Sequence, residues 1–189
     1  SLPGFHKVLG PVMSTFGAPA VLYERDSLPP YARVIVAAAK VPEAQIVPTV
    51  TNPRFPVNQV VLLPESASVQ PAPLTQPLAH SGVKASVTEW RPGAMRIALD
   101  GADPGPSYLV VSENWYPDWG AQVDDQPGQV LRGDHSLLTV VLPPGARVVS
   151  LRFNSPAYAR GKLLSLLSLV CALVLILVPL ILGRRAASA

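Results

Sequence analysis

The sequence predicts a mainly β protein, an antiparallel β-sandwich or jelly-roll-like domain followed by a single C-terminal transmembrane helix. Three observations predict this fold class. The chain has 22 prolines in 189 residues, almost all of them before residue 163, and they exclude long helices from that part. Short β-rich runs alternate there with Pro-Gly turns. Twenty uncharged, mainly apolar residues then occupy positions 163–182.

The predicted strands are short runs of apolar and β-branched residues. Val83–Trp90 alternates apolar with polar residues, which is typical of a half-buried strand. Turns such as Arg91-Pro92-Gly93 separate the runs and favour antiparallel neighbours. The predicted strands are Ala32–Ala38, Val57–Leu62, Val83–Trp90, Met95–Leu99, Tyr108–Ser112, Ala121–Val123, Ser136–Leu142 and Arg147–Phe153.

Composition divides the chain into four parts. We expect an extended N-terminal arm over residues 1–20 and a β-sandwich domain over residues 21–160. A segment rich in Pro, Ser, Ala and Gln, about 64–80, reads as an exposed linker within that domain. The transmembrane helix at 163–182 and a short basic tail at 183–189 complete the chain.

The predicted membrane anchor runs from Leu163 to Leu182 and reads LLSLLSLVCALVLILVPLIL. A helix of this length spans about 30 Å, the thickness of the hydrocarbon core of a bilayer. Arg184 and Arg185 follow it, and other basic residues precede it. Because the basic residues on its two sides are nearly balanced, charge alone does not predict its orientation.

Composition also excludes some classes of function. The formal net charge is +3, and Arg184 and Arg185 of the tail supply two of these charges. A nucleic-acid-binding protein would show a basic stripe with interleaved aromatic residues, and none occurs, so we expect no nucleic-acid partner. The one cysteine, Cys171, lies inside the apolar run and has no intrachain cysteine to pair with.

The sequence carries no signal for catalysis. The three histidines lie far apart with no metal-ligand spacing, and neither a nucleophile elbow nor a phosphate-binding loop occurs. Asp124, Asp125 and Asp134 lie close in sequence, and we interpret them as exposed turn carboxylates rather than calcium ligands. We therefore expect no catalytic residue, no cofactor and no metal, and we expect that the chain is not an enzyme.

Four residues form an aromatic corner and are the candidate structural or interaction site. Trp115, Tyr116 and Trp119 fall within five positions, and Pro117 favours a turn between them. The favoured interpretation is that the rings pack onto one end of the sandwich. Two alternatives stay open: stacking on a carbohydrate or lipid headgroup, and contact with another protein.

The segment Leu109–Phe153 resembles the C-terminal extracytoplasmic domain of YfhO-like bacterial membrane proteins, which belong to a glycosyltransferase-C-like superfamily. The residues that carry the resemblance are Ser112-Glu113, Tyr116-Pro117-Asp118-Trp119, Val123-Asp124-Asp125, Pro144-Gly145 and Val148–Phe153, with an earlier match at Leu22–Arg25 and Leu28–Arg33. It covers residues 20–182, including the last transmembrane helix. Asp118 stands where the family favours Gly, and Asp125-Gln126 replaces its usual Asp-Gly.

The resemblance implies a location as well as a fold. It places the chain in the bacterial cytoplasmic (inner) membrane as a single-pass protein, with the sandwich on the periplasmic, extracytoplasmic side and the tail in the cytoplasm. YfhO-like proteins resemble polytopic lipid-linked glycosyltransferases, whose reaction needs acidic residues between many membrane helices. This sequence contains one such helix, so the resemblance does not transfer that chemistry.

Two functions from different classes follow. The first is a non-catalytic, membrane-anchored accessory subunit whose β domain braces or helps to assemble a larger hetero-oligomeric membrane complex, with a respiratory or photosynthetic complex as a candidate host. The alternative is a C-terminal fragment of a polytopic lipid-linked glycosyltransferase, its β domain aiding sugar or lipid-carrier binding. Because the sequence begins at Ser1 and not at Met, we expect a processed product or a fragment.

Overall fold

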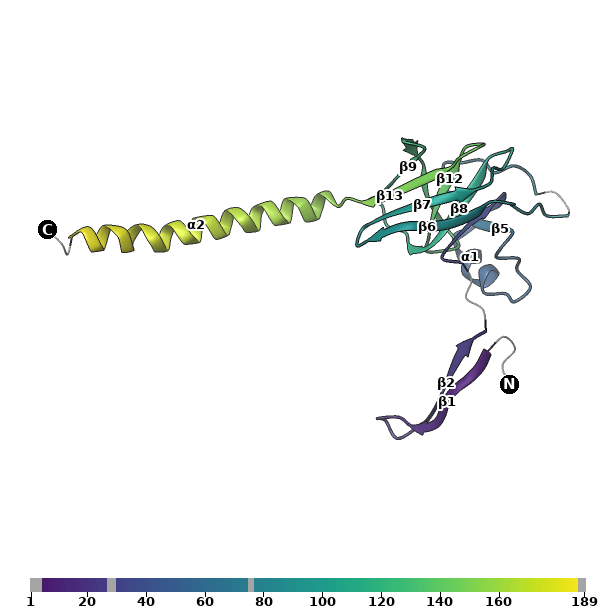
Figure 1. The fold of residues 1–189 in the computed structure, drawn as a ribbon, viewed down its shortest axis with the longest axis horizontal. Helices are drawn as coiled ribbons and strands as arrows, with labels where there is room; N and C mark the ends of the chain where they lie inside the picture. Colours follow the sequence, from purple (N-terminus) through teal and green to yellow (C-terminus); the bar gives the residue numbers. More distant parts are fainter. Residues whose placement is uncertain (1–4, 27–29, 75–76, 187–189) are drawn as a thin grey trace.

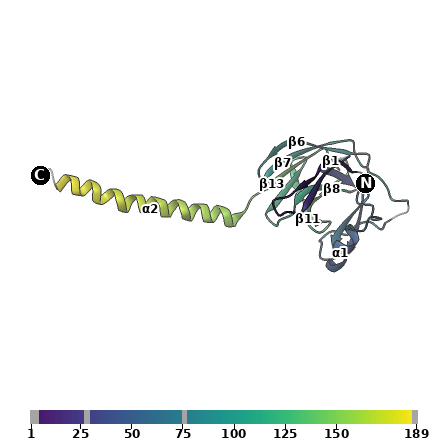
Figure 2. The same ribbon diagram turned by 90° about the horizontal axis from the view of Figure 1, so that it is seen from below.

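The computed structural model of the chain describes residues 5–26, 30–74 and 77–186. It confirms the predicted fold class. The protein is mainly β, its strands pair almost entirely antiparallel, and one long helix follows them (Figure 1). Figures 1 and 2 show most strands gathered in one body, from which the helix projects.

All eight predicted runs overlap strands of the structure, and several elements occur that the sequence did not predict. These additional elements are β1, β2, β10, β11 and α1. In chain order the structure contains β1 (Phe5–Met13), β2 (Pro19–Arg25), β3 (Ala32–Ile35), β4 (Ala37–Val41), α1 (Glu43–Val50), β5 (Val60–Pro64), β6 (Lys84–Arg91), β7 (Ala94–Asp100), β8 (Ser107–Asn114), β9 (Trp119–Val123), β10 (Gln126–Gly128), β11 (Val130–Gly133), β12 (Leu137–Leu142), β13 (Val148–Phe153) and α2 (Pro156–Ala186).

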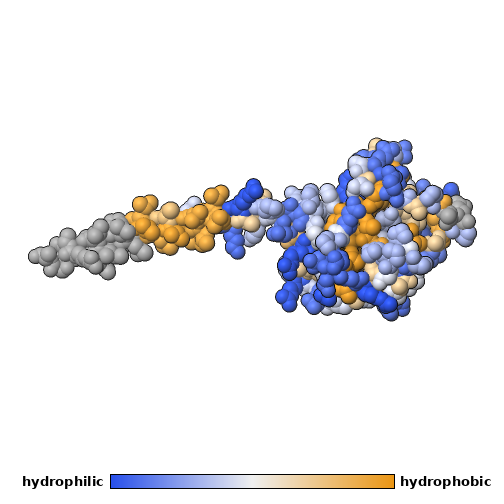
Figure 3. Space-filling view, turned by 90° about the horizontal axis from the view of Figure 1, so that it is seen from above, coloured by the Kyte–Doolittle hydropathy of each residue, from blue (hydrophilic) through white to orange (hydrophobic). Residues whose placement is uncertain are grey.

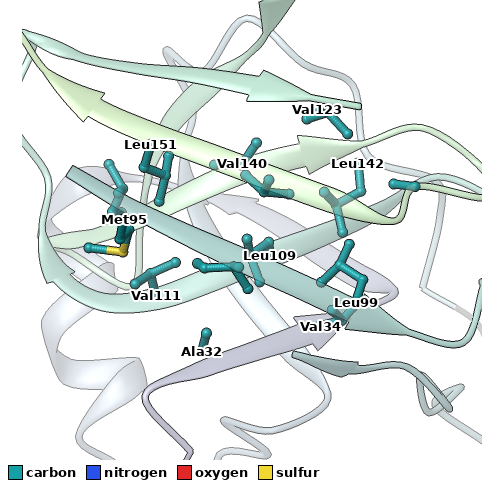
Figure 4. Close-up of a cluster of buried hydrophobic side chains, with 14 residues drawn as sticks. Ala32, Val34, Met95, Leu99, Leu109, Val111, Val123, Val140, Leu142 and Leu151 are labelled. Carbon is teal, nitrogen blue, oxygen red and sulfur yellow. The ribbon is translucent and has the colours of Figure 1, made fainter. Parts of the chain in front are cut away.

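Two antiparallel sheets form the sandwich. One has the strand order β10–β9–β13–β7–β6 and the other β11–β12–β8–β3. In β7, the side chains of Met95, Ile97 and Leu99 are buried and the residues between them are more exposed, as the period-two geometry of a strand requires. Figure 4 shows Met95 and Leu99 in the same cluster as Leu109 and Val140 of the opposite sheet. The main core therefore lies between the two sheets.

A smaller layer covers the outer face of the four-stranded sheet. In it, β4 and β5 pair in parallel, and α1 lies between them in the sequence. Val61 of β5 joins Val110 of the sheet in one buried cluster, and Leu62 joins Ile46 of α1 in another. Both faces of β5 are thus buried, which explains its uninterrupted apolar sequence, Val60–Pro64.

The Pro-rich segment 64–80 lies along this layer over part of its length. Ala67 and Val69 pack against the buried cluster. The Lys40 ammonium donates to the carbonyl of Ala67 at 2.7 Å, and the Gln129 side-chain amide donates to the Ser68 hydroxyl at 2.6 Å. Residues 75–76 lie outside the described part. The segment expected to be an exposed linker is therefore partly fastened to the domain.

The N-terminal segment forms a two-stranded hairpin. β1 and β2 pair with each other, and within the described residues neither pairs with a strand of the sandwich. Figure 1 shows the hairpin standing apart from the sheets. The boundary expected between an arm at 1–20 and a sandwich at 21–160 falls inside β2, because Pro19–Arg25 pairs with the arm.

A buried ion pair joins the sandwich to the outer layer. The Asp134 carboxylate, in the turn between β11 and β12, accepts hydrogen bonds from the Leu62 N–H at 2.9 Å and the Arg33 guanidinium at 3.1 Å. The Asp134 N–H in turn donates to the Leu62 carbonyl at 2.9 Å. Burial raises the pKa of Asp134 and lowers the pKa of Arg33, although their mutual attraction acts in the opposite direction.

The prediction that Asp134 is an exposed turn carboxylate is wrong. Only 2% of its side chain is exposed. Asp134 does lie in a turn, with a φ of 46°, but that turn packs beneath β5. The residues of the outer layer that cover Asp134 lie about seventy positions earlier in the chain. The sequence around Asp134 therefore does not indicate that its side chain is buried.

Removing Asp134 alone should cost more stability than removing both members of the pair. We expect Asp134→Leu to lower the free energy of unfolding by about 3–5 kcal/mol, because it leaves the Arg33 charge buried and unpaired. Combining it with Arg33→Met should recover part of this loss. The measurement is urea unfolding of the full chain in detergent micelles, followed by tryptophan fluorescence. A double variant less stable than Asp134→Leu would contradict the prediction.

Candidate functional site

The helix α2 is long and apolar enough to cross a membrane. It contains 31 residues, or about 46 Å at about 1.5 Å per residue, against about 30 Å of hydrocarbon core. Over Pro156–Leu175 its mean hydropathy is 1.6 and none of the window is buried in the protein, and Figure 3 shows its bare apolar surface. The helix contains the predicted anchor, Leu163–Leu182, and Arg184 and Arg185 lie near its end.

The first turns of α2 have a different character from the rest. Pro156 begins the helix directly after Ser155, whose carbonyl accepts the Ala159 N–H at 3.1 Å. Tyr158 is exposed, and Arg160 and Lys162 follow before the uncharged run begins. Aromatic and basic side chains of this kind are typical of the headgroup region of a membrane.

The aromatic corner lies at the end of the sandwich from which α2 departs. The Trp119 N–H donates to the carbonyl of Tyr116 at 3.1 Å, which closes a turn around Pro117. The Asn154 N–H donates to the carbonyl of Asp118 at 3.0 Å. The corner is therefore hydrogen-bonded to Asn154, the first of the two residues that connect β13 to α2.

Phe153 is the centre of this cluster, although it was not among the four residues predicted to form the aromatic corner. Its ring centroid lies 5.5 Å from that of Trp119, edge-on, and 5.9 Å from that of Tyr116. Trp119 is half-buried against the main core, whereas Tyr116 is 58% exposed. Phe153 follows the buried Val149 and Leu151 in a period of two, and this alternation could have identified it.

Trp115 does not join the other two aromatic residues of the corner. It packs against the main core, and the Arg132 guanidinium carbon lies 6.0 Å from its ring centroid. The backbone N–H of Trp115 donates to the carbonyl of Ser136 at 2.7 Å. Trp115 and Trp119 thus contribute to packing, while Tyr116 remains free for an external contact.

Beside the corner, the outer face of the five-stranded sheet has a hollow of about 740 Å³. Its floor consists of small residues from three adjacent strands, Ala94 of β7, Ser150 of β13 and Gly120 of β9. Because these residues have little or no side chain, the longer side chains around them stand above the floor as walls. Asn154 and Pro156 also line the hollow, so it reaches the start of α2.

Charged side chains surround this hollow, which we call the arginine hollow. Arg91, Arg96 and Arg152 come from β6, β7 and β13. All three are exposed, and none pairs with a carboxylate of the described residues. The carboxylates that also line it are those of Glu89, Asp118 and Asp125. The hollow could not be predicted from the sequence, because only the register of the strands brings these residues together.

The three aspartates that lie close in sequence do not converge. The Asp124 carboxylate accepts the backbone N–H groups of Arg147 and Val148, the latter at 2.8 Å, and so braces a turn. Asp134 pairs with Arg33, and Asp125 lines the arginine hollow. Across residues 5–26, 30–74 and 77–186, no three metal-ligating side chains form a group that could hold an ion.

Truncation of Trp119 should cost more stability than truncation of Tyr116. We expect Trp119→Ala to lower the free energy of unfolding by about 2–4 kcal/mol, because the ring packs on both the core and Phe153. Tyr116→Ala, at an exposed position, should cost less than about 1 kcal/mol. Urea unfolding of both full-length variants in micelles, followed by circular dichroism, measures the difference. Equal losses would contradict the assignment of Trp119 to packing.

Comparisons with known proteins do not assign the chain to a family. No protein-family model, no curated protein and no solved structure matches it significantly. The aromatic corner, the arginine hollow, the hairpin and the helix are therefore interpreted from their own residues.

Proposed function

We propose that this chain is a non-catalytic, membrane-anchored accessory subunit whose β domain helps to assemble a larger membrane protein complex. The observation that carries the proposal is the N-terminal hairpin, which displays apolar side chains that the described part of the chain leaves uncovered. The helix α2 supports it by providing an anchor that would hold the hairpin near other membrane proteins.

The exposed apolar residues lie on both faces of the hairpin. Leu9 and Leu22 are cross-strand partners on one face and are 54% and 57% exposed. Val21 and Tyr23, which point to the other face because successive side chains alternate, are each 40% exposed. Phe16, at the tip, is 95% exposed. An apolar surface of this kind on a two-stranded ribbon is typical of a protein-contact site.

The resemblance to YfhO-like proteins supports a location for this subunit. We place it in the bacterial cytoplasmic membrane, with the β domain on the periplasmic side and the C-terminal tail in the cytoplasm. The partners would be other subunits of a hetero-oligomeric membrane complex, of respiratory or photosynthetic type. A protease-protection experiment on sealed membranes that cleaved the sandwich only from the cytoplasmic side would contradict this topology.

A second candidate function is supported by a different observation. The arginine hollow adjoins the start of α2, and a site there could aid sugar or lipid-carrier binding in a polytopic lipid-linked glycosyltransferase of which this chain is the C-terminal part. The length of the open reading frame upstream of Ser1 distinguishes the two candidates. Many membrane helices upstream would favour the transferase, and a short leader would favour the accessory subunit.

Polar substitutions in the hairpin should weaken assembly without unfolding the sandwich. We expect Leu9→Ser combined with Leu22→Ser to reduce at least fivefold the fraction of the chain that migrates in a larger complex after mild detergent extraction. The reason is that both side chains lose their apolar contact with the partner. Thr15→Ser, a conservative change near the tip, is the control. An unchanged complex in the double variant would contradict the proposed role of the hairpin.

A further inference from the structure

We propose that the arginine hollow binds the headgroup of an anionic phospholipid from the membrane that α2 enters. The ligand chemistry is a phosphodiester, held by arginines, joined to a group that donates hydrogen bonds to carboxylates. Three observations carry this inference: the position of the hollow, the composition of its walls and the exposed tyrosine that follows it on α2.

The position of the hollow brings it to the membrane surface. Its lining includes Asn154 and Pro156, and the uncharged part of α2 begins at Leu163. The seven helical residues between them, 156–162, span about 10 Å. The headgroup layer on each side of a bilayer is about 5–7 Å thick. An arginine side chain is long enough to reach across the remaining few ångströms, and Arg152 precedes Asn154 by only two residues. The arginines of the hollow are therefore within reach of the headgroups.

The walls of the hollow provide the groups that bind a phosphodiester. Cross-strand register places Arg152 of β13 opposite Ala94 of β7, and Ala94 opposite Arg91 of β6. Two guanidinium groups thus flank one small residue on the same face of the sheet, and Arg96 lies in the next row. A guanidinium donates two parallel hydrogen bonds to phosphate oxygens, which makes arginine the favoured residue for this ligand.

The charge balance of this end of the molecule favours an anionic headgroup. The three arginines share the hollow with three carboxylates. Arg160 and Lys162 add two positive charges in the first turns of α2, and the first turn contains no acidic residue. Five cations thus face three carboxylates near the membrane. Figure 3 shows strongly hydrophilic residues between the apolar part of the helix and the domain. Basic side chains at this depth are attracted to anionic lipid.

The carboxylates of the hollow indicate the rest of the headgroup. Asp118 and Asp125 line the same cavity as the arginines and belong to the loops at the two ends of β9. Ionised carboxylates accept hydrogen bonds and do not donate them. They therefore fit a headgroup that carries hydroxyls beyond its phosphate, as the glycerol of phosphatidylglycerol does.

An exposed tyrosine follows the hollow at the start of α2. Tyr158 lies two residues after Pro156 of the hollow's lining and is 73% exposed. Tyrosine is enriched at membrane interfaces, where its ring lies at the level of the headgroups. The inference does not depend on the proposed assembly function, because the hairpin contributes no residue to the hollow.

The experiment is native mass spectrometry of the full chain released from detergent micelles. Micelles contain either dioleoyl phosphatidylglycerol or dioleoyl phosphatidylcholine at matched concentrations, and the bound fraction is measured as lipid is titrated. We expect phosphatidylglycerol to bind at least tenfold more tightly than phosphatidylcholine. Arg152→Gln and Arg96→Gln should each weaken the binding of phosphatidylglycerol about tenfold, because each removes a charged donor to the phosphate.

Arg147→Gln is the matched control, because it removes the same charge from an exposed residue at the opposite end of β13. It should leave binding unchanged. An equal loss in Arg147→Gln and Arg152→Gln would overturn the proposal in favour of diffuse charge attraction, and so would equal binding of the two lipids. Soluble sn-glycerol 3-phosphate is a third ligand. If it bound as tightly as phosphatidylglycerol, the hollow would be a site for free phosphate compounds and not for lipid.

Discussion

Asp134 links the four-stranded sheet of the sandwich to the outer layer formed by β4, β5 and α1. Its side chain receives hydrogen bonds from β5 and from Arg33 of β3, and its backbone donates to β5. The neighbouring Gly133 shows how close these elements are, because a Cβ there would overlap the Thr139 hydroxyl and lie 2.8 Å from a methyl group of Val61. The outer layer can bury its apolar face only while this approach is maintained, so the burial of β5 depends on it.

The strands of the sandwich could be predicted because their signal is local. Val83–Trp90 and Met95–Leu99 alternate and are separated by a Pro-Gly turn, and these properties need no distant partner. The parallel pairing of β4 with β5 could not be predicted in this way, since α1 contains Pro48 and reads as a loop. The same distinction between local and long-range signals applies to the candidate site. The aromatic corner is contiguous in sequence, whereas Arg91 and Arg152 meet only through the register of three strands.

The polar and aromatic groups singled out above lie near the start of α2, the helix that is long and apolar enough to cross a membrane. The aromatic corner, the arginine hollow and the basic first turns of α2 adjoin one another, and β13 connects all three. This arrangement follows from the topology. Because β13 lies between β7 and β9, the groups that its neighbours carry on the outer face are brought to the start of the helix. The hairpin, by contrast, carries its apolar residues on a separate ribbon (Figure 1).

The connection between β13 and α2 has a mechanical consequence. Only Asn154 and Ser155 separate a central strand from the helix, and Figure 1 shows α2 leaving the domain close to the direction of that strand. A force that pulls on the helix is therefore transmitted along β13 and shears its hydrogen bonds to β7 and β9 together, instead of opening them one at a time. The domain is thus joined to this helix through a strand that is paired on both of its edges.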